Sequence, residues 1–222
     1  YDAFIAGHAS NSISAALGLA VSASLKGKDE RTIAIIGDGA MSGGLAYEGL
    51  NNASSSSNNL LIILNDNNIS IDKNIGGLHE YLLKITTNPK YNDAKKRVWD
   101  RLGDGWVRKA VQKFVTTTKS HLVSDSGGDL FQAMGFRYFG PFDGNDLDKM
   151  ISVLSHIKNI DDNCVVHIKT VKGKGYTPAE KNPADFHAMS PAQAGETKQN
   201  GRSFSAVMGN KLLSLAKENK DI

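Results

Sequence analysis

The sequence predicts an α/β fold in which a parallel sheet is flanked by helices. Two short, apolar and β-branched runs, Thr32 to Ile36 and Leu60 to Leu64, are typical of strands that are buried on both faces. A helical pattern at Ser42 to Ala53 separates them, and strand, helix and strand in this order form a right-handed βαβ unit. The length of 222 residues, with 40% hydrophobic and 22% charged residues, is enough for one sizeable core.

The remaining elements follow in order along the chain. Ser10 or Asn11 can cap a first helix that runs to about Leu25, and Gly27 ends it. After residue 128 the α/β pattern resumes with a short helix. The later elements are a strand at residues 136–139, a helix at 146–157, a strand at 164–170, a glycine-rich basic loop from Val171, and a helix at 204–220.

Residues 70–127 form a basic excursion that the sequence predicts to be mostly helical. Trp106 and Phe114 lie on one face of a helix there, and Arg108 and Lys113 lie on the other. Such a helix packs on the main body, or it forms a nucleic-acid or membrane surface. The packing interpretation is favoured, so we expect neither a nucleic acid nor a membrane as partner.

Charge, cysteine content and chain ends add further expectations. The net charge of +3 is too small to indicate nucleic-acid binding, and no apolar run reaches the length of about 18 residues that a membrane span needs. Cys164 cannot form an internal disulfide and is interpreted as a small buried hydrophobe in a reducing compartment. The chain opens at Tyr1 without methionine, so we expect a fragment: an α/β domain at 1–198, then a linker and the first helix of a second domain at 199–222.

Two polar turns follow the two strands of the βαβ unit. Asp38 stands between two glycines after the first strand, and Asn67 follows the second strand 29 residues later. Ligands of open parallel sheets bind outside the carboxyl ends of the strands, so both side chains are expected at one site. Gly39 and Ala40 open the loop into the next helix, and their N–H groups suit a phosphate.

A divalent cation reconciles Asp38 with a neighbouring phosphate. Mg²⁺ prefers about six oxygen ligands, of which the protein commonly gives one or two and phosphate and water the rest. Asp38 would give a carboxylate oxygen, Asn67 an amide oxygen, and Ile69 its main-chain carbonyl. The two turns are thus predicted to be halves of one metal–diphosphate clamp.

Two alternatives remain open on these residues alone. The glycines at 37, 39 and 43 resemble a dinucleotide-binding turn, in which Asp66 would hold a ribose. Without a metal, however, Asp38 would direct a negative charge at the pyrophosphate. The other alternative is a pair of unrelated tight turns, which explains each half but not their joint placement.

Several stretches together resemble the 1-deoxy-D-xylulose-5-phosphate synthase family. The pairing of Gly37-Asp38-Gly39 with Asn65-Asp66-Asn67 is similar to the thiamine-diphosphate signature. The family is narrowed by "GHASNSISAALGLA", "GDGAMSGGLAYEGLNNA", "LIILNDNNISID", "FRYFGPFDGND" and "VKGKGYTPAEKNPADFHAM". The resemblance covers most of the chain, and the basic excursion carries little of it.

The resemblance implies a transferase with thiamine diphosphate (thiamine pyrophosphate) and Mg²⁺ as cofactors. Members condense pyruvate with D-glyceraldehyde 3-phosphate to 1-deoxy-D-xylulose 5-phosphate and CO₂. This is the first step of the methylerythritol phosphate route to isoprenoids, and the product also feeds thiamine biosynthesis. The cofactor carries the difficult chemistry, and the protein holds and tunes it. By the same resemblance we expect a homodimer in a bacterial cytoplasm, with a plastid-type organelle as the alternative.

The resemblance also implies roles for individual residues. It makes Asp38, Asn67 and the Ile69 carbonyl the metal ligands, with Asn67 also a cofactor contact, and it places Gly39 and Ala40 on the diphosphate.

A second group of residues is carried over in the same way. Gly7, His8 and Ala9 line the cofactor, Tyr176 contacts it, and His187 matches a histidine that faces the substrates. The residues alone leave His8 and His187 open as ordinary helix-start and loop histidines. The remaining histidines show no metal-ligand spacing and are assigned to surface or packing: His79, His121, His156 and His167.

Some features depart from the family or stay open. Asn145 stands where the family usually has histidine, a change that we expect to be tolerated. Lys172 and Lys174 are interpreted as solvated loop lysines rather than as ligands of the aldehyde's phosphate.

The family's remaining catalytic groups define the rival hypotheses. The resemblance implies that they are histidines in the region that precedes Tyr1, and a glutamate of the second domain that activates the aminopyrimidine ring. The chain alone is therefore predicted to be inactive. The rivals are another thiamine-diphosphate enzyme, such as a transketolase or the E1 component of a 2-oxo-acid dehydrogenase, and a cofactor-binding fragment without chemistry.

Overall fold

The computed structural model describes residues 3–4, 7–56, 59–69, 74–87, 129–187 and 204–221. The chain divides into two compact units, Tyr1–His187 and Ala188–Ile222. The predicted domain boundary between residues 198 and 199 lies outside the described residues and stays a prediction.

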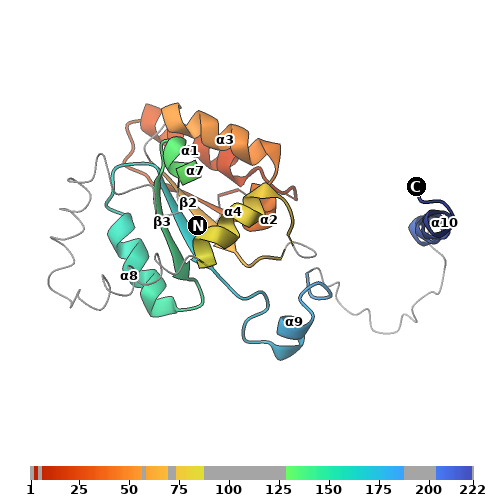
Figure 1. Ribbon diagram of the computed structural model, residues 1–222. Coiled ribbons are helices and arrows are strands. Elements are labelled where there is room, and N and C mark those ends of the chain that lie inside the picture. The colour runs from red at the N-terminus through yellow and green to blue at the C-terminus, as the bar shows by residue number, and fades with distance from the viewer. Residues whose placement is uncertain are drawn as a thin grey trace, which may run out of the picture. The chain divides into compact units, whose positions relative to one another are not determined.

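The first unit is built on a four-stranded sheet, which confirms the predicted fold class (Figure 1). All neighbouring strands are parallel, and their order is β1-β2-β4-β3. Their bounds are β1 Thr32–Gly37, β2 Leu60–Asp66, β3 Arg137–Asp143 and β4 Cys164–Lys169. Because β2 and β4 are the central strands, their carboxyl ends lie in the middle of the side of the sheet where all four strands end.

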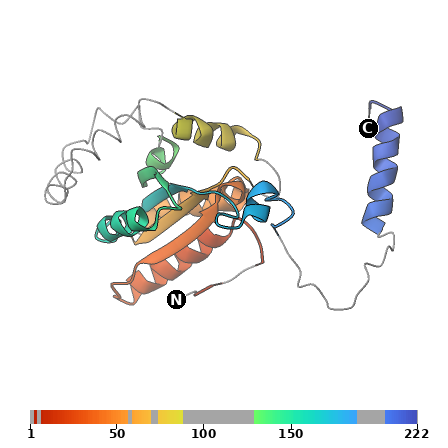
Figure 2. The same cartoon turned by 90° about the horizontal axis from the view of Figure 1, so that it is seen from below.

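Helices cover both faces of the sheet (Figures 1 and 2). One core lies between the sheet and α1 (Ser12–Leu25), α3 (Gly44–Ser56), α4 (Gly77–Thr87) and α7 (Asp129–Ala133). A second core lies on the opposite face beneath α8 (Leu147–Ile157). Cys164 is fully buried in this second core, which confirms its interpretation as a buried hydrophobe.

The two strands of the βαβ unit differ in burial. In β2 every residue except Asn65 is buried, as predicted. In β1 only Ala34 and Ile36 are buried, whereas Ile33 and Ile35 remain 54% and 66% exposed. The expectation that this strand is buried on both faces is therefore wrong, because β1 is an edge strand and α8 packs over β2, β3 and β4 instead.

The structure adds short helices where the sequence predicted loops. Residues Asp38–Met41 form the single turn α2, and α3 begins only at Gly44 instead of Ser42. Within the glycine-rich loop, Thr177–Lys181 form α9, with a proline in its first turn. Asn11 is the N-cap residue of α1 as predicted, but its side chain makes no capping hydrogen bond.

Only the beginning of the basic excursion belongs to the described residues. There, α4 is helical as predicted, and the hydroxyl of Tyr81 accepts a hydrogen bond from the N–H of Leu130 at 3.1 Å. This hydrogen bond connects α4, at the start of the excursion, with Leu130 in the chain that follows the excursion. The predicted amphipathic helix around Trp106 lies outside the described residues.

The second unit contains α10 (Phe204–Glu218), a helix that the sequence predicted. Its large apolar side chains are exposed: Phe204, Val207, Met208, Leu212 and Leu213. Across the described ranges, no helix combines the length and the hydropathy needed to cross a bilayer.

Candidate functional site

The carboxyl ends of β1 and β2 bring the two polar turns side by side. Gly37 pairs with Asn65 in the parallel ladder, so the residues that follow each strand leave the same sheet edge together. Asp38 begins α2 directly after β1, and Asn67 follows β2. The predicted juxtaposition of the two turns is therefore present.

Asp38 links the two turns through its own side chain. It is only 6% exposed, and its Oδ2 accepts hydrogen bonds from the N–H of Asn68 at 3.0 Å and from Nδ2 of Asn74 at 2.7 Å. One carboxylate at the end of β1 thus holds the chain that follows β2 at two points. This cross-link argues against two unrelated turns.

The turn after β2 contains the other two predicted ligands, the amide of Asn67 and the main chain of Ile69. Oδ1 of Asn67 accepts a hydrogen bond from the N–H of Ile69 at 3.0 Å. Asn68 between them has a φ of 59°, in the left-handed region that asparagine adopts more readily than most residues. An amide oxygen has a second lone pair, so this local bond still leaves Asn67 able to coordinate a cation.

Asp66 belongs to the same cluster but faces inward. It is 1% exposed, and its Oδ2 lies 3.0 Å from Nε2 of the fully buried His167. Its Oδ1 accepts a hydrogen bond from the N–H of Asn68 at 3.2 Å. A carboxylate held in this way is closed to a ribose, which removes the support for the dinucleotide alternative.

The two carboxyl groups titrate in opposite directions. Burial raises the pKa of Asp38, and the neighbouring Asp66 raises it further. Burial also raises the pKa of Asp66, but its hydrogen bond with His167 and the charge interaction with that residue reverse the shift, so the net change is downward. The net pKa shift is therefore upward for Asp38 and downward for Asp66.

Sequence reasoning missed the partner of Asp66. His167 had been assigned to surface or packing; it is buried, yet it also makes hydrogen bonds, with Nε2 towards Asp66 and Nδ1 2.7 Å from the hydroxyl of Tyr138. The available signal was a histidine inside the apolar strand Cys164–Lys169, two residues before its end. A polar residue buried at such a position needs a partner.

Gly39 and Ala40 lie in α2, next to the stretch that contains Gly7, His8 and Ala9. Oγ of Ser10 donates a hydrogen bond to the carbonyl of Ala40 at 2.6 Å, which ties the end of that stretch to α2. A Cβ atom at Gly43 would overlap the Ser10 hydroxyl, so the glycine permits this approach. The structure therefore brings two of the predicted cofactor-contact stretches together.

The remaining predicted site residues lie in the loop after β4. Tyr176 and Phe186 pack edge to face with ring centroids 5.6 Å apart, and Nζ of Lys172 lies 2.8 Å from Nδ1 of His187. Within the described part of the chain, these contacts join Tyr176 and His187 to their own loop, and none joins them to Asp38 or Asn67.

The base of that loop, however, is fixed to the sheet edge. Oγ1 of Thr170 donates a hydrogen bond to Oδ1 of Asn65 at 2.6 Å. Oδ1 of Asn145 accepts one from the N–H of Val171 at 2.9 Å. The asparagine that departs from the family pattern therefore holds the first residue of the loop.

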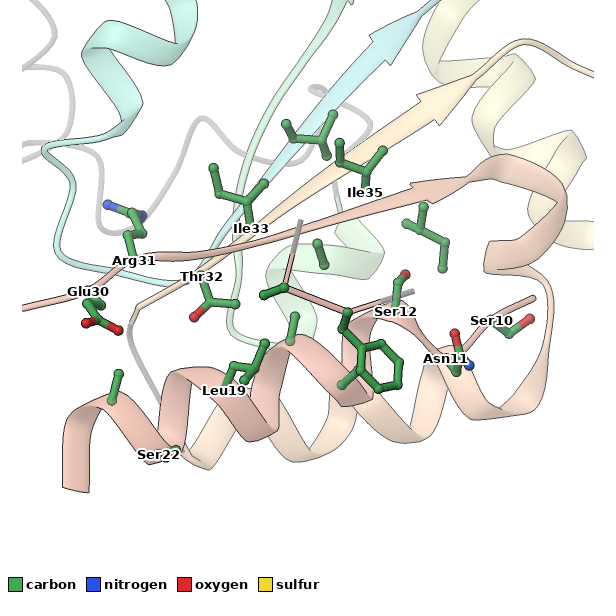
Figure 3. A pocket seen from close by; sticks show the side chains of 18 of the residues that line it. Ser10, Asn11, Ser12, Leu19, Ser22, Glu30, Arg31, Thr32, Ile33 and Ile35 are labelled. Carbon is green, nitrogen blue, oxygen red and sulfur yellow. The ribbon is translucent and has the colours of Figure 1, made fainter. Parts of the chain in front are cut away.

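Two hollows adjoin the predicted site residues. A small one of about 190 Å³ lies between Asp38, Gly39, Ser42 and Asn74 on one side and the half-buried His79 of α4 on the other. A larger groove of about 1150 Å³ lies along the edge strand β1. Figure 3 shows Leu19 and Ser22 on α1 at one side of this strand, whereas Ile33 and Ile35 point to its opposite side. The small hollow contains the polar atoms, and the groove is mostly apolar.

The donor set of the two turns fits a hard cation. Among the described residues, no group of three or more His, Cys, Asp and Glu side chains is placed to hold a metal ion. What the turns offer instead is one buried carboxylate with amide and main-chain oxygens, the oxygen-only chemistry of Mg²⁺. Such a site is completed by water and by the oxygens of a bound phosphate.

The fold and the site define a parallel α/β protein with a candidate site for a phosphate and a divalent cation at the carboxyl ends of β1 and β2. Residues 1–170 match the family model described as 1-deoxy-D-xylulose-5-phosphate synthase. The chain therefore belongs to this family.

Curated relatives agree with this assignment. The chain is 44% identical over 228 residues to the 1-deoxy-D-xylulose-5-phosphate synthase of Porphyromonas gingivalis, with 97% of this chain and 36% of that protein covered. It is 46% identical over 235 residues to the enzyme of the same name from Bacteroides thetaiotaomicron, with 100% of this chain and 36% of that protein covered. The chain thus spans about a third of the length of these relatives.

Among solved structures, a transketolase from Campylobacter jejuni is similar at 17% identity and a TM-score of 0.41, with 74% of this chain and 20% of that chain covered.

Proposed function

We propose that this chain is the cofactor-binding part of an enzyme that condenses pyruvate with D-glyceraldehyde 3-phosphate to 1-deoxy-D-xylulose 5-phosphate and CO₂. The observation that carries the proposal is the buried Asp38, whose Oδ2 accepts hydrogen bonds from Asn68 and Asn74 in the chain that follows β2. Family membership supplies the reaction, and the site supplies the place where its cofactor would be held.

Mg²⁺ would be held by the Asp38 carboxylate, the Asn67 amide oxygen and the Ile69 carbonyl. Asp38 is buried beside a second carboxyl group, and burial, followed by the charge of Asp66, raises the pKa of Asp38. A divalent cation on Asp38 favours its charged form and compensates the charge of a diphosphate. The pair of acids thus favours a cation-dependent site.

The diphosphate of thiamine diphosphate would lie against Gly39 and Ala40. Ser10 fixes the stretch with Gly7, His8 and Ala9 next to Ala40, which supports the role of that stretch as a wall of the cofactor site. When bound, the cofactor supplies a thiazolium group that stabilises carbanions.

Residues of the loop after β4 would complete the site from the substrate side. Tyr176 would contact the cofactor, and His187 would face the substrates as a catalytic residue. The 2.8 Å contact with Lys172 supports an ordered role for His187, because an ammonium group can only donate and so presents its proton to Nδ1. In that arrangement the ring proton is on Nε2, from which it can be donated towards a substrate oxygen.

The chain by itself is expected to be inactive, since family members draw further catalytic groups from outside the region that it represents. We propose a bacterial cytoplasmic homodimer as the complete protein. Detectable turnover by the purified 222-residue chain would contradict this part of the proposal.

The reaction is tested with the full-length protein, thiamine diphosphate and Mg²⁺. Pyruvate and D-glyceraldehyde 3-phosphate are expected to yield one CO₂ per 1-deoxy-D-xylulose 5-phosphate, measured by labelled CO₂ release and by product chromatography. Ketol transfer between sugar phosphates, without CO₂ release, would instead indicate a transketolase. Acyl transfer from pyruvate to a lipoyl group would indicate an E1 component.

A further inference from the structure

A buried polar chain crosses three strands of the sheet and ends at the turn that would bind the metal. It consists of Tyr138 in β3, His167 in β4 and Asp66 in β2. His167 and Asp66 are 0% and 1% exposed. Burying such groups costs free energy unless every one is paired, so a chain of them inside an apolar sheet calls for a reason.

Nε2–H of His167 donates to Oδ2 of Asp66 at 3.0 Å, because a carboxylate can only accept. Nδ1 pairs with the hydroxyl of Tyr138 at 2.7 Å, accepting from it when the ring is neutral and donating to it when the ring is charged. Oδ1 of Asp66 remains to accept from the N–H of Asn68 at 3.2 Å. His167 therefore fixes the plane of a carboxylate whose other oxygen holds the turn.

The chain of hydrogen bonds ends at the N–H of Asn68, a residue that lies between the predicted metal ligands in the sequence. Asn68 separates Asn67 from Ile69, and its N–H is shared between Asp66 and Oδ2 of Asp38 at 3.0 Å. Because Asn68 adopts a φ of 59°, its conformation depends on bonds that hold the turn in place. A rotation of Asp66 would shift all three predicted ligands relative to one another.

The far end of the chain is fixed by packing. The ring of Tyr138 stacks on the fully buried Phe131, with ring centroids 5.6 Å apart and planes 5° from parallel. A Cβ atom at Gly140 would overlap the backbone of His167, so β3 approaches β4 closely at this point only because that residue is glycine. The donors behind Asp66 are thus held rigidly.

We propose that His167, supported by Tyr138, is a positioning residue that orients Asp66 and thereby sets the geometry of the 67–69 turn for Mg²⁺ and diphosphate. This inference rests on the proposed function. Outer partners of metal ligands act in this way, and their loss typically weakens metal binding by about 10- to 100-fold.

A merely structural role makes a different prediction, and the sheet offers a matched control. Asn163 is also buried; its Oδ1 accepts from the N–H of Leu60 at 3.1 Å and its Nδ2 donates to the carbonyl of Ala53 at 2.9 Å. It lies next to the first residue of β4, at the opposite end of the sheet from Asp66. Asn163→Ala should lower the unfolding temperature without changing metal affinity.

The experiment measures the Mg²⁺ dissociation constant of the full-length protein by calorimetry at saturating thiamine diphosphate, together with the unfolding temperature. His167→Leu is expected to weaken Mg²⁺ binding by about 10-fold or more. His167→Gln, whose amide can still donate to Asp66, is expected to recover most of that loss. Tyr138→Phe keeps the stacked ring but removes the hydroxyl that pairs with Nδ1 of His167. Because His167 itself remains, Mg²⁺ binding is expected to weaken by only about threefold.

The outcomes separate the two proposals. Wild-type protein without Mg²⁺-dependent cofactor binding would overturn the proposed function and this inference with it. Normal wild-type binding together with unchanged affinity in His167→Leu would overturn the positioning role alone. The positioning role would also be overturned if Asn163→Ala lost as much Mg²⁺ affinity as His167→Leu for the same fall in unfolding temperature. If His167→Leu does not fold, Tyr138→Phe decides: unchanged affinity contradicts the inference.

Discussion

The two ends of the sheet both carry buried polar side chains, but they use them in opposite ways. At the amino ends of the strands, the buried Asn163 and the half-buried Arg31 satisfy main-chain groups; Nη2 of Arg31, for example, donates to the carbonyl of Asp162 at 2.9 Å. At the carboxyl ends, Asp38 and Asp66 are placed close together, and the pKa of Asp38 is raised by burial and by its neighbour. The first end pairs its polar groups with main-chain atoms, whereas the second holds two buried carboxyl groups close together.

This difference separates scaffold from site. A polar cluster that only stabilises a protein pairs donors with acceptors, as Nη1 of Arg31 does with the carbonyls of Ile157 and Lys158 at the end of α8. A cluster with two adjacent carboxyl groups lowers stability until a cation arrives, and proteins keep such arrangements where they bind or react. Mutations at the two ends should therefore change different quantities.

The largest expected effect is that of Asp38→Asn on metal binding. Loss of the only predicted carboxylate ligand should weaken Mg²⁺-dependent binding of thiamine diphosphate by more than about 100-fold, beyond the range for an outer partner. The same change removes a buried carboxylate next to Asp66, so the free energy of unfolding without metal at pH 7 should rise by about 1 kcal/mol. Calorimetry and urea unfolding measure the two quantities.

Asp143→Asn is the control for this change. Asp143 is an exposed carboxylate at the carboxyl end of β3, where its Oδ1 accepts from the N–H of Asn145 at 2.9 Å. Both affinity and stability should stay within about twofold and 0.5 kcal/mol of wild type. Equal effects of the two substitutions would contradict the contrast between the acids.

At the amino end, Arg31→Met is expected to act on stability alone. The guanidinium donates hydrogen bonds to main-chain carbonyls that follow α8, and several charged hydrogen bonds are lost together. The free energy of unfolding should fall by about 2 kcal/mol. Mg²⁺-dependent binding should be unchanged in the folded variant, and a clear loss of affinity there would show that the two ends are coupled.

The smallest expected effect concerns pH and the Cys164 thiol. Burial raises the pKa of this thiol from 9.0 to about 11. The folded protein therefore holds the thiol proton more tightly than the unfolded chain does. The resulting contribution to stability is complete below the unfolded pKa of 9.0, and it is lost as the pH rises from about 9 to about 11. The stability advantage of wild type over Cys164→Ala should therefore shrink between pH 8 and pH 11.

A pH series of urea unfolding for both proteins measures this gap, and other titrating groups cancel in the difference. A thiol reagent provides a second readout, since a buried neutral thiol should react slowly with native protein at pH 7. A gap that stays constant with pH would show that Cys164 ionises equally in both states.

The comparison also shows what sequence can predict. The strands, their parallel pairing and the juxtaposition of the turns that contain Asp38 and Asn67 follow from apolar runs and from the rule that carboxyl ends share one edge. The partnership of Asp66 with His167 does not, because these residues are 101 positions apart and only the placement of β4 beside β2 brings them together. The exposure of Ile33 and Ile35 was missed for the same reason, since an edge strand has the same composition as a central one.

The most direct test of the metal–diphosphate clamp is calorimetric titration of the full-length protein with thiamine diphosphate, with and without Mg²⁺, beside an NAD titration. The account predicts binding that requires Mg²⁺ and disappears in Asp38→Ala, and no binding of NAD. Binding of thiamine diphosphate that is equally tight without a divalent cation, or NAD binding without metal, would contradict it.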